Sequence, residues 1–172
     1  MSDSIKLKSI TITGNSPGPK LLILGGIHGD EFESMWAIRR LKETLVPDAL
    51  NGSITLIPIV NEGAFWLGQR TAEDGLDLAR TCPGKENGST TEQVAFLVSK
   101  LIRESDYLID LHSGGLVSKF YPTAGYMLHD DSEVLEMQQK MADAFNMPVI
   151  WGTNARHEGR TLSIARDALI PA

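Results

Sequence analysis

The 172-residue sequence is poor in cysteine, has no excess of positive charge and contains no long apolar run. Its one cysteine, Cys82, excludes an intrachain disulfide and any cysteine-rich zinc module, and we interpret it as an inert small residue in a loop. The 16 Lys and Arg against 22 Asp and Glu give a net charge of −6, which argues against a general nucleic-acid binder. No run approaches the ~20 apolar residues of a membrane span, and residues 1–6 lack the apolar core of a signal peptide. We therefore expect a cytoplasmic protein that binds neither nucleic acid nor membranes.

Internal repeats, low-complexity tracts and linkers are also absent. The composition, 42% hydrophobic and 22% charged, is that of an ordinary globular protein. A chain of this size can bury about two thirds of its unfolded surface. We therefore expect residues 1–172 to form one domain.

Short apolar runs alternate with longer amphipathic stretches. The apolar and β-branched runs predict strands over residues 6–12 (a half-exposed edge), 20–24, 53–60, 107–111 and 148–151. Apolar spacings of three and four predict helices over residues 32–45, 91–104, 132–146 and 162–168. This alternation predicts an α/β fold, with a mostly parallel or mixed sheet and helices on both faces.

Three finer expectations follow from the same patterns. Thr90 or Thr91 is the expected N-cap of the second helix. The helix over 132–146 is expected to turn Leu135, Met141 and Phe145 inward. Residues 74–90 form the one long loop, and long loops inside compact domains are often functional.

Histidines follow two of the predicted buried strands. His28 and Glu31 lie just after the strand over 20–24, and His112 ends the strand over 107–111. Sites in open α/β sheets form at the carboxyl ends of strands, so these side chains can meet at one rim. Two histidines and one carboxylate are a common catalytic zinc set that leaves a fourth position for water.

The residues alone leave two interpretations open, a metal site and ordinary loop histidines. A lone histidine after a strand, or a His-x-x-Glu pair, is weak evidence for a metal. The glycines on both sides of His28 favour a metal because they allow close approach of the backbone. Phosphate binding is not favoured, since the glycine-rich loop matches neither Gly-x-Gly-x-x-Gly nor the P-loop.

An ordered series of motifs resembles the succinylglutamate desuccinylase/aspartoacylase family, which is related to the zinc carboxypeptidases. The motifs are Gly25-Gly26-Ile27-His28-Gly29-Asp30-Glu31, Pro58 to Phe65, Arg70, Asp77-Leu78-Ala79-Arg80, Pro83-Gly84, Thr91 to Ala95, and Asp110-Leu111-His112-Ser113-Gly114. The resemblance implies a zinc carboxypeptidase-like (phosphorylase/hydrolase-like) fold.

The resemblance also implies roles for individual residues. His28, Glu31 and His112 match the zinc ligands. Arg70 matches the arginine that polarises the substrate carbonyl and stabilises the oxyanion. The arginine that binds the substrate carboxylate is matched by Arg80, and Arg160 is a further candidate for contact with the substrate.

The sequence departs from the family pattern in two places. Ala79 stands where the family usually has an asparagine before the carboxylate-binding arginine, which removes one hydrogen bond to a dicarboxylic substrate. In the family, the general-base glutamate lies on a strand after the last motif, and the resemblance implies that this strand would follow Ala172. The upstream glutamates do not match that position: Glu33, Glu43 and Glu136 lie on helical patterns, and we interpret Glu62 as a loop carboxylate.

Three hypotheses follow. The first is a zinc-dependent amidohydrolase that removes the acyl group from a small N-acyl amino acid. The second is a metallocarboxypeptidase that acts on short peptides with the same metal site. The third, prompted by the missing base, is a non-catalytic metal-binding module or an inactive fragment. We also expect an unpaired sheet edge and exposed apolar surface where the next strand would lie. The expected macromolecular partner is a second copy of the chain or a missing C-terminal segment.

Overall fold

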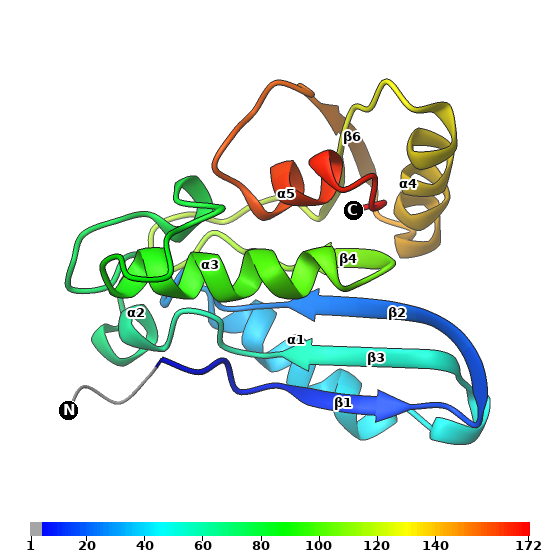
Figure 1. The fold of residues 1–172 in the computed structure, drawn as a ribbon, viewed down its shortest axis with the longest axis horizontal. Helices are drawn as coiled ribbons and strands as arrows, with labels where there is room; N and C mark the ends of the chain where they lie inside the picture. Colours follow the sequence, from blue (N-terminus) through cyan, green and yellow to red (C-terminus); the bar gives the residue numbers. More distant parts are fainter. Residues whose placement is uncertain (1–4) are drawn as a thin grey trace.

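A four-stranded sheet forms the centre of the computed structural model, which describes residues 5–172 (Figure 1). The strands are β1 (Ile10–Thr13), β2 (Ser16–Leu24), β3 (Asn51–Ile57), β4 (Tyr107–Asp110), β5 (Thr123–Met127) and β6 (Val149–Thr153). The order in the central sheet is β1-β3-β2-β4, with β1 antiparallel to β3 and the other pairs parallel. The predicted α/β class with a mostly parallel sheet is confirmed.

Helices cover both faces of this sheet. The helices of the described residues are α1 (Phe32–Thr44), α2 (Glu62–Leu67), α3 (Thr90–Arg103), α4 (Ser132–Phe145) and α5 (Thr161–Asp167), with short 3₁₀ turns η1 (Pro47–Ala49) and η2 (Leu78–Arg80). Of these, α1 packs on one face of the four-stranded sheet, and α3 and α5 pack on the other. Successive residues of a strand point to opposite faces. Leu22 and Leu24 of β2 therefore join one buried cluster with Ile102 of α3 and α5 side chains, while Ile23 packs with Ile38 of α1. None of the helices in residues 5–172 is long and apolar enough to cross a bilayer.

The predicted elements are present, although the ends of the strands differ from the predicted ones by up to four residues, and two elements were missed. All four predicted helices form, displaced by one residue or less at either end. The predicted edge strand over 6–12 is wrong in its bounds, because regular pairing with β3 begins only at Ile10. The short helix α2 and the strand β5 were not predicted, since each is too short to show a clear period.

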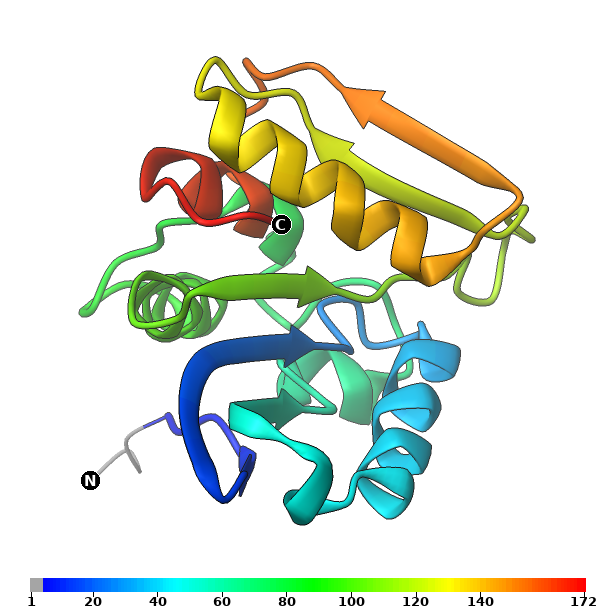
Figure 2. The same cartoon turned by 90° about the vertical axis from the view of Figure 1, so that its right-hand side faces the viewer.

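The predicted strand over 148–151 forms as β6, but it does not join the central sheet. It pairs in parallel with β5, and α4 lies across one face of this two-stranded sheet (Figure 2). The segment that contacts the outer edge of β4 is instead the one around Pro171, whose carbonyl accepts a hydrogen bond from the Leu108 N–H at 3.0 Å. Pairing between distant segments decided this placement.

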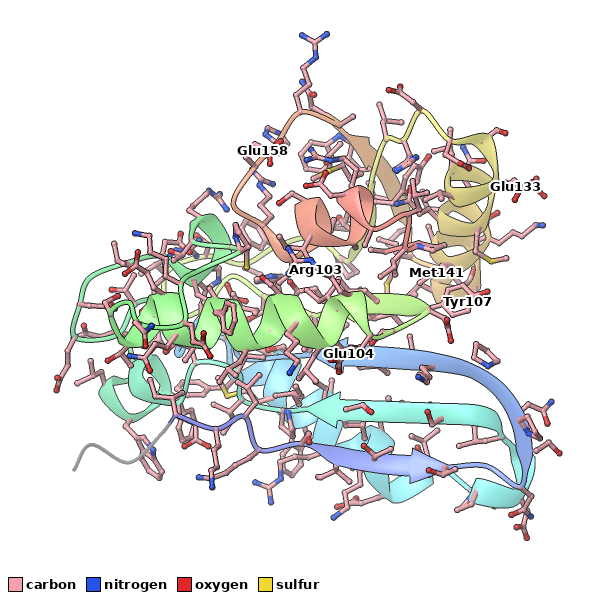
Figure 3. All side chains as sticks on the ribbon, viewed as in Figure 1. Arg103, Glu104, Tyr107, Glu133, Met141 and Glu158 are labelled. Carbon is pink, nitrogen blue, oxygen red and sulfur yellow. The ribbon has the colours of Figure 1, made fainter. Side chains whose placement is uncertain are left out.

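The inward face of α4 also differs from the expectation. The buried residues are Val134, Gln138 and Ala142. Of the three residues predicted to face inward, Phe145 is exposed, and Leu135 and Met141 are half-buried. Figure 3 shows Met141 on the side of α4 that faces the rest of the domain and Glu133 pointing away from it. The buried stripe is shifted by about one residue from the predicted one, because the helix packs against β5.

Side chains of the preceding loop, Asp74 and Ser89, hold the start of α3. Its N-cap is Ser89, not Thr90 or Thr91, and Ser89 and Glu92 form a reciprocal capping box. The carboxylate of Asp74 accepts hydrogen bonds from the Ser89 hydroxyl (2.7 Å), the Thr91 hydroxyl (2.7 Å) and the Thr91 N–H (2.8 Å). Burial raises the pKa of Asp74, but these hydrogen bonds outweigh it and lower the pKa below its usual value. Asp74 thus connects the long loop to α3.

We predict that Asp74→Ala lowers the free energy of unfolding at neutral pH by about 1–3 kcal/mol, because the capping groups lose their acceptor. A depressed carboxyl pKa stabilises the fold above the ordinary Asp pKa, and this contribution disappears as pH falls through the folded-state pKa. The difference in the free energy of unfolding between the wild-type and variant proteins should therefore become smaller at acidic pH. Urea denaturation at several pH values measures it. Asp143→Ala, on the exposed end of α4, serves as the control and should change stability by less than about 0.5 kcal/mol.

Candidate functional site

The predicted site residues lie where two parallel strands end side by side. Leu24 of β2 pairs with Asp110 of β4, so the loops that follow these two strands leave the sheet at the same rim. His28 and Glu31 come from the first loop and His112 from the second. The sequence-based expectation that these segments share one rim is thus met by the strand order.

The glycines around His28 are required by the backbone path. Gly26 adopts φ = 62°, a left-handed conformation that other residues rarely adopt. At Gly29 a Cβ atom would lie 2.0 Å from the carbonyl carbon of Ala64, which belongs to α2. His28 is therefore held between the sheet and α2, and its side chain is only 3% exposed.

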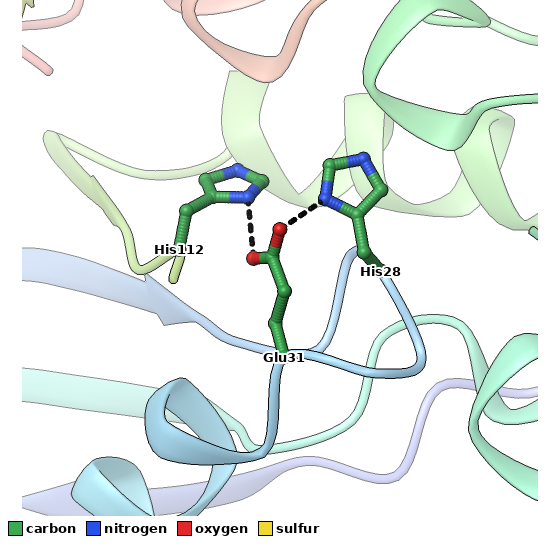
Figure 4. A group of neighbouring side chains, drawn as sticks. All are labelled: His28, Glu31 and His112. Carbon is green, nitrogen blue, oxygen red and sulfur yellow. Dashed lines mark hydrogen bonds and ion pairs between the residues drawn. The ribbon is translucent and has the colours of Figure 1, made fainter. Parts of the chain in front are cut away.

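The three side chains converge on one point (Figure 4). The Nδ1 atom of His28 lies 2.7 Å from one carboxylate oxygen of Glu31, and Nδ1 of His112 lies 2.9 Å from the other. One ligand atom from each residue falls within 4.8 Å of the others. The Glu31 carboxylate is 4% exposed and also accepts the Ser113 N–H at 3.0 Å.

Each histidine is held on its far side by a second carboxylate. Nε2 of His28 lies 3.0 Å from Asp77, and Nε2 of His112 lies 3.3 Å from Asp110. A carboxylate that accepts the Nε2–H leaves the Nδ1 lone pair free for a metal ion and orients the ring. Sequence reasoning assigned no role to either aspartate, although Asp110 stands two residues before His112 and Asp77 lies within a quoted motif.

The carboxylates dominate the electrostatics of the cluster. Burial raises the pKa of Glu31, but hydrogen bonds from His112 and His28 outweigh it and lower the pKa to about 2. Burial lowers the pKa of His112, whereas Asp110 and Glu31 raise it to about 10. Three carboxylates around two imidazoles therefore make a centre that attracts positive charge. Two Nδ1 atoms and one ionised carboxylate, each oriented from behind, fit a divalent cation such as zinc.

Arg70 lies beside this cluster. Its guanidinium donates to Asp77 through Nη2 (3.0 Å) and Nε (3.3 Å), and its Nη1 is 3.9 Å from Glu31. The side chain is half exposed, so one side of the guanidinium remains open to solvent. The structure thus brings Arg70 to the predicted ligands, through an aspartate that was not predicted.

Arg80 and Arg160 are brought together by a contact between two loops. The Cys82 N–H donates to the Gly159 carbonyl at 3.0 Å, which packs the residue before Arg160 against the turn that carries Arg80. Arg80 donates to the Ala79 carbonyl, and the Nε of Arg160 is buried with no hydrogen-bond partner. Burial and the neighbouring Arg80 charge lower the pKa of Arg160. Two arginines on neighbouring loops, one with an Nε donor that has no partner, form a suitable place for a carboxylate.

The remaining predicted features lie around this rim. Cys82 is buried in the loop after η2, and burial raises the pKa of its thiol to about 11, as expected of an inert residue. Glu62 lies in the first turn of α2, not in a loop, and pairs with Lys8 at 2.9 Å. Glu33 is exposed as expected but also accepts the Ser113 hydroxyl at 2.7 Å, a contact beside the cluster that was not predicted.

Comparison with known proteins agrees with the geometry. The family model of the succinylglutamate desuccinylase/aspartoacylase catalytic domain matches residues 17–169. The N-alpha-acetyl-L-2,4-diaminobutyric acid deacetylase of Halomonas elongata is 36% identical over 141 residues, which cover 81% of this chain and 41% of that protein.

Two solved structures share the fold. A succinylglutamate desuccinylase/aspartoacylase from Rhodobacter sphaeroides superposes with a TM-score of 0.87 at 25% identity, covering 97% of this chain and 50% of that one. The product-bound ectoine utilization protein EutE (DoeB) from Ruegeria pomeroyi gives a TM-score of 0.82 at 27% identity, covering 95% and 50%.

The chain spans about half the length of the relatives it matches. The family match nevertheless extends over most of the chain and includes the loops after β2 and β4 and the turn η2. The zinc carboxypeptidase-like α/β fold expected from the motifs is confirmed. The chain belongs to the succinylglutamate desuccinylase/aspartoacylase family.

Proposed function

We propose that this chain carries the metal centre and part of the substrate site of a zinc-dependent amidohydrolase that cleaves the amide bond of a small N-acyl amino acid. The observation that carries the proposal is the convergence of His28, Glu31 and His112 at the shared rim of β2 and β4. These three residues would hold the zinc ion and leave its fourth position open. When bound, zinc supplies a Lewis acid for the scissile carbonyl and a water of lowered pKa.

The protein's own residues would then supply charge and orientation. Asp77 and Asp110 hold the two imidazoles by their Nε2 atoms, so that both Nδ1 atoms face the same point. Arg70, fixed by two hydrogen bonds to Asp77, presents positive charge close to the ligands. A fixed guanidinium there stabilises the negative charge that develops on the carbonyl oxygen.

The substrate carboxylate would bind at the paired arginines. Arg80 and the half-buried Arg160 offer donors to an anion, and their mutual repulsion falls when a carboxylate lies between them. Ala79, where the family usually has an asparagine, provides no side-chain donor, so the two arginines carry this recognition. One carboxylate, rather than a dicarboxylic substrate, suits such a site.

The similarity to a deacetylase of N-acetyl diaminobutyrate favours an acetyl or similarly small acyl group. A metallocarboxypeptidase would use the same metal centre, and a substrate panel separates the two activities: N-acetyl and N-succinyl amino acids against short unblocked peptides. The proposal gives the proton shuttle to none of the glutamates discussed above, and hydrolysis is proposed for the whole protein. Metal binding is testable on the chain itself.

The first prediction concerns zinc. The chain should bind one zinc ion, and His28→Ala or His112→Ala should each remove that stoichiometric binding, because only two ligands remain. Dialysis followed by elemental analysis measures the zinc content. His157→Ala is the matched control, since its side chain is outside the cluster, and should keep its zinc. A wild-type chain that holds no zinc would overturn the proposed centre.

The second prediction concerns Arg70. Arg70→Ala should lower kcat by about 10²–10³-fold, because an oxyanion donor acts mainly in the transition state. Steady-state kinetics of the whole protein on an N-acetyl amino acid measures this, with Arg70→Lys expected to keep part of the rate through its charge. An equal kcat in the Arg70→Ala variant would exclude the oxyanion role.

The third prediction concerns substrate affinity. Arg80→Ala should raise KM by about 10–100-fold, the equivalent of about 1.5–3 kcal/mol for a hydrogen bond to a charged group. Its effect should vanish for the corresponding amide substrate, which lacks the carboxylate. Arg156→Ala, an exposed arginine four residues before Arg160, is the control and should leave KM unchanged.

A further inference from the structure

Asp110 is a buried carboxylate with an unusual set of partners. Its side chain is 2% exposed, and its Oδ2 atom accepts the Thr161 hydroxyl at 2.5 Å and lies 3.3 Å from Nε2 of His112. Its other oxygen, Oδ1, is buried without a hydrogen-bond partner. All the polar contacts of the carboxylate are therefore made by one oxygen.

Such a group is a poor device for stability. Burying a charged carboxylate is costly unless its oxygens are well paired, and here one oxygen is unpaired. The hydrogen bond from the Thr161 hydroxyl does not require a charged residue at position 110, because a neutral side-chain oxygen there could accept it equally. The contact with His112 does benefit from a charge, since Nε2 lies 3.3 Å from Oδ2 and an anion there attracts the imidazole N–H.

Thr161 reaches this carboxylate from a distant part of the chain. It is the first residue of α5, is 3% exposed, and lies 51 residues after Asp110, the last residue of β4. The hydroxyl of Thr161 thus joins the start of α5 to the end of β4. Arg160, which caps α5, precedes Thr161 directly, so the same turn faces both the paired arginines and the metal cluster.

We propose that Thr161 is a positioning residue for the metal centre: its hydroxyl fixes the Asp110 carboxylate, which holds Nε2 of His112 and aims Nδ1 at the metal. This inference rests on the proposed zinc site. Nε2 of His112 lies 3.3 Å from Oδ2 of Asp110, and a carboxylate at this position favours the tautomer that carries the proton on Nε2 and leaves the Nδ1 lone pair free. Removing the hydroxyl frees the carboxylate to rotate and so loosens a ligand that Thr161 never touches.

The test compares Thr161→Val, which keeps the branched shape and removes the hydroxyl, with Thr161→Ser, which restores a hydroxyl. Zinc affinity is measured by competition with a chromophoric chelator, and ligand geometry by the visible absorption of the Co²⁺-loaded chain. Thr161→Val should bind zinc about tenfold more weakly and show a shifted Co²⁺ spectrum. Thr161→Ser should recover most of the affinity.

The chain offers a matched control in Thr91→Val. Thr91 is also a buried threonine in the first turn of a helix, and its hydroxyl also donates to an aspartate, Asp74, at 2.7 Å. Asp74 is not part of the metal cluster. Thr91→Val should therefore lower the melting temperature without changing zinc affinity or the Co²⁺ spectrum.

The outcomes separate this inference from the proposed function. If wild-type protein binds zinc and Thr161→Val binds it equally tightly, the positioning role is wrong and the zinc site stands. If wild-type protein binds no zinc, the proposed function itself fails. Should Thr161→Val not fold, Asp110→Asn keeps the shape of the side chain and removes its charge, and the proposal requires about tenfold weaker zinc binding there too.

Discussion

The parallel pairing of β2 with β4 is the constraint on which the site depends. Because Leu24 lies opposite Asp110, the two loops that follow these strands leave the sheet at one rim, and residues 81 positions apart come into hydrogen-bonding distance. Layers of apolar side chains on both faces fix this pairing, with Leu22 and Leu24 buried on one side and Ile23 on the other. The chemistry of the rim is thus built on the packing of the sheet.

Charged side chains of both signs gather at this rim. Glu31, Asp77 and Asp110 surround two imidazoles. Burial raises the pKa of Glu31, but hydrogen bonds from His112 and His28 outweigh it and lower the pKa to about 2. Such a cluster is satisfied by a cation at its centre. Beside it, Arg70, Arg80 and Arg160 carry positive charge, which suits the anionic substrate of the proposed function.

Much of the site was predictable because its residues stand in short motifs. His28 and Glu31 are three residues apart, and His112 ends a buried strand, so local pattern and strand order together indicate their meeting. The supporting aspartates were missed for a physical reason. Asp77 reaches His28 across 49 residues of chain, and no local pattern indicates a contact of this kind.

The sequence by itself determined the kinds of element, the α/β class, the family and the three converging side chains, because these depend on local period and on ordered motifs. Only the tertiary structure decided that β6 pairs with β5 outside the central sheet, that α4 buries Gln138 rather than Phe145, and that Thr161 contacts Asp110. Each of these is a contact between distant segments. Its free energy depends on which surfaces meet, and no local pattern encodes that.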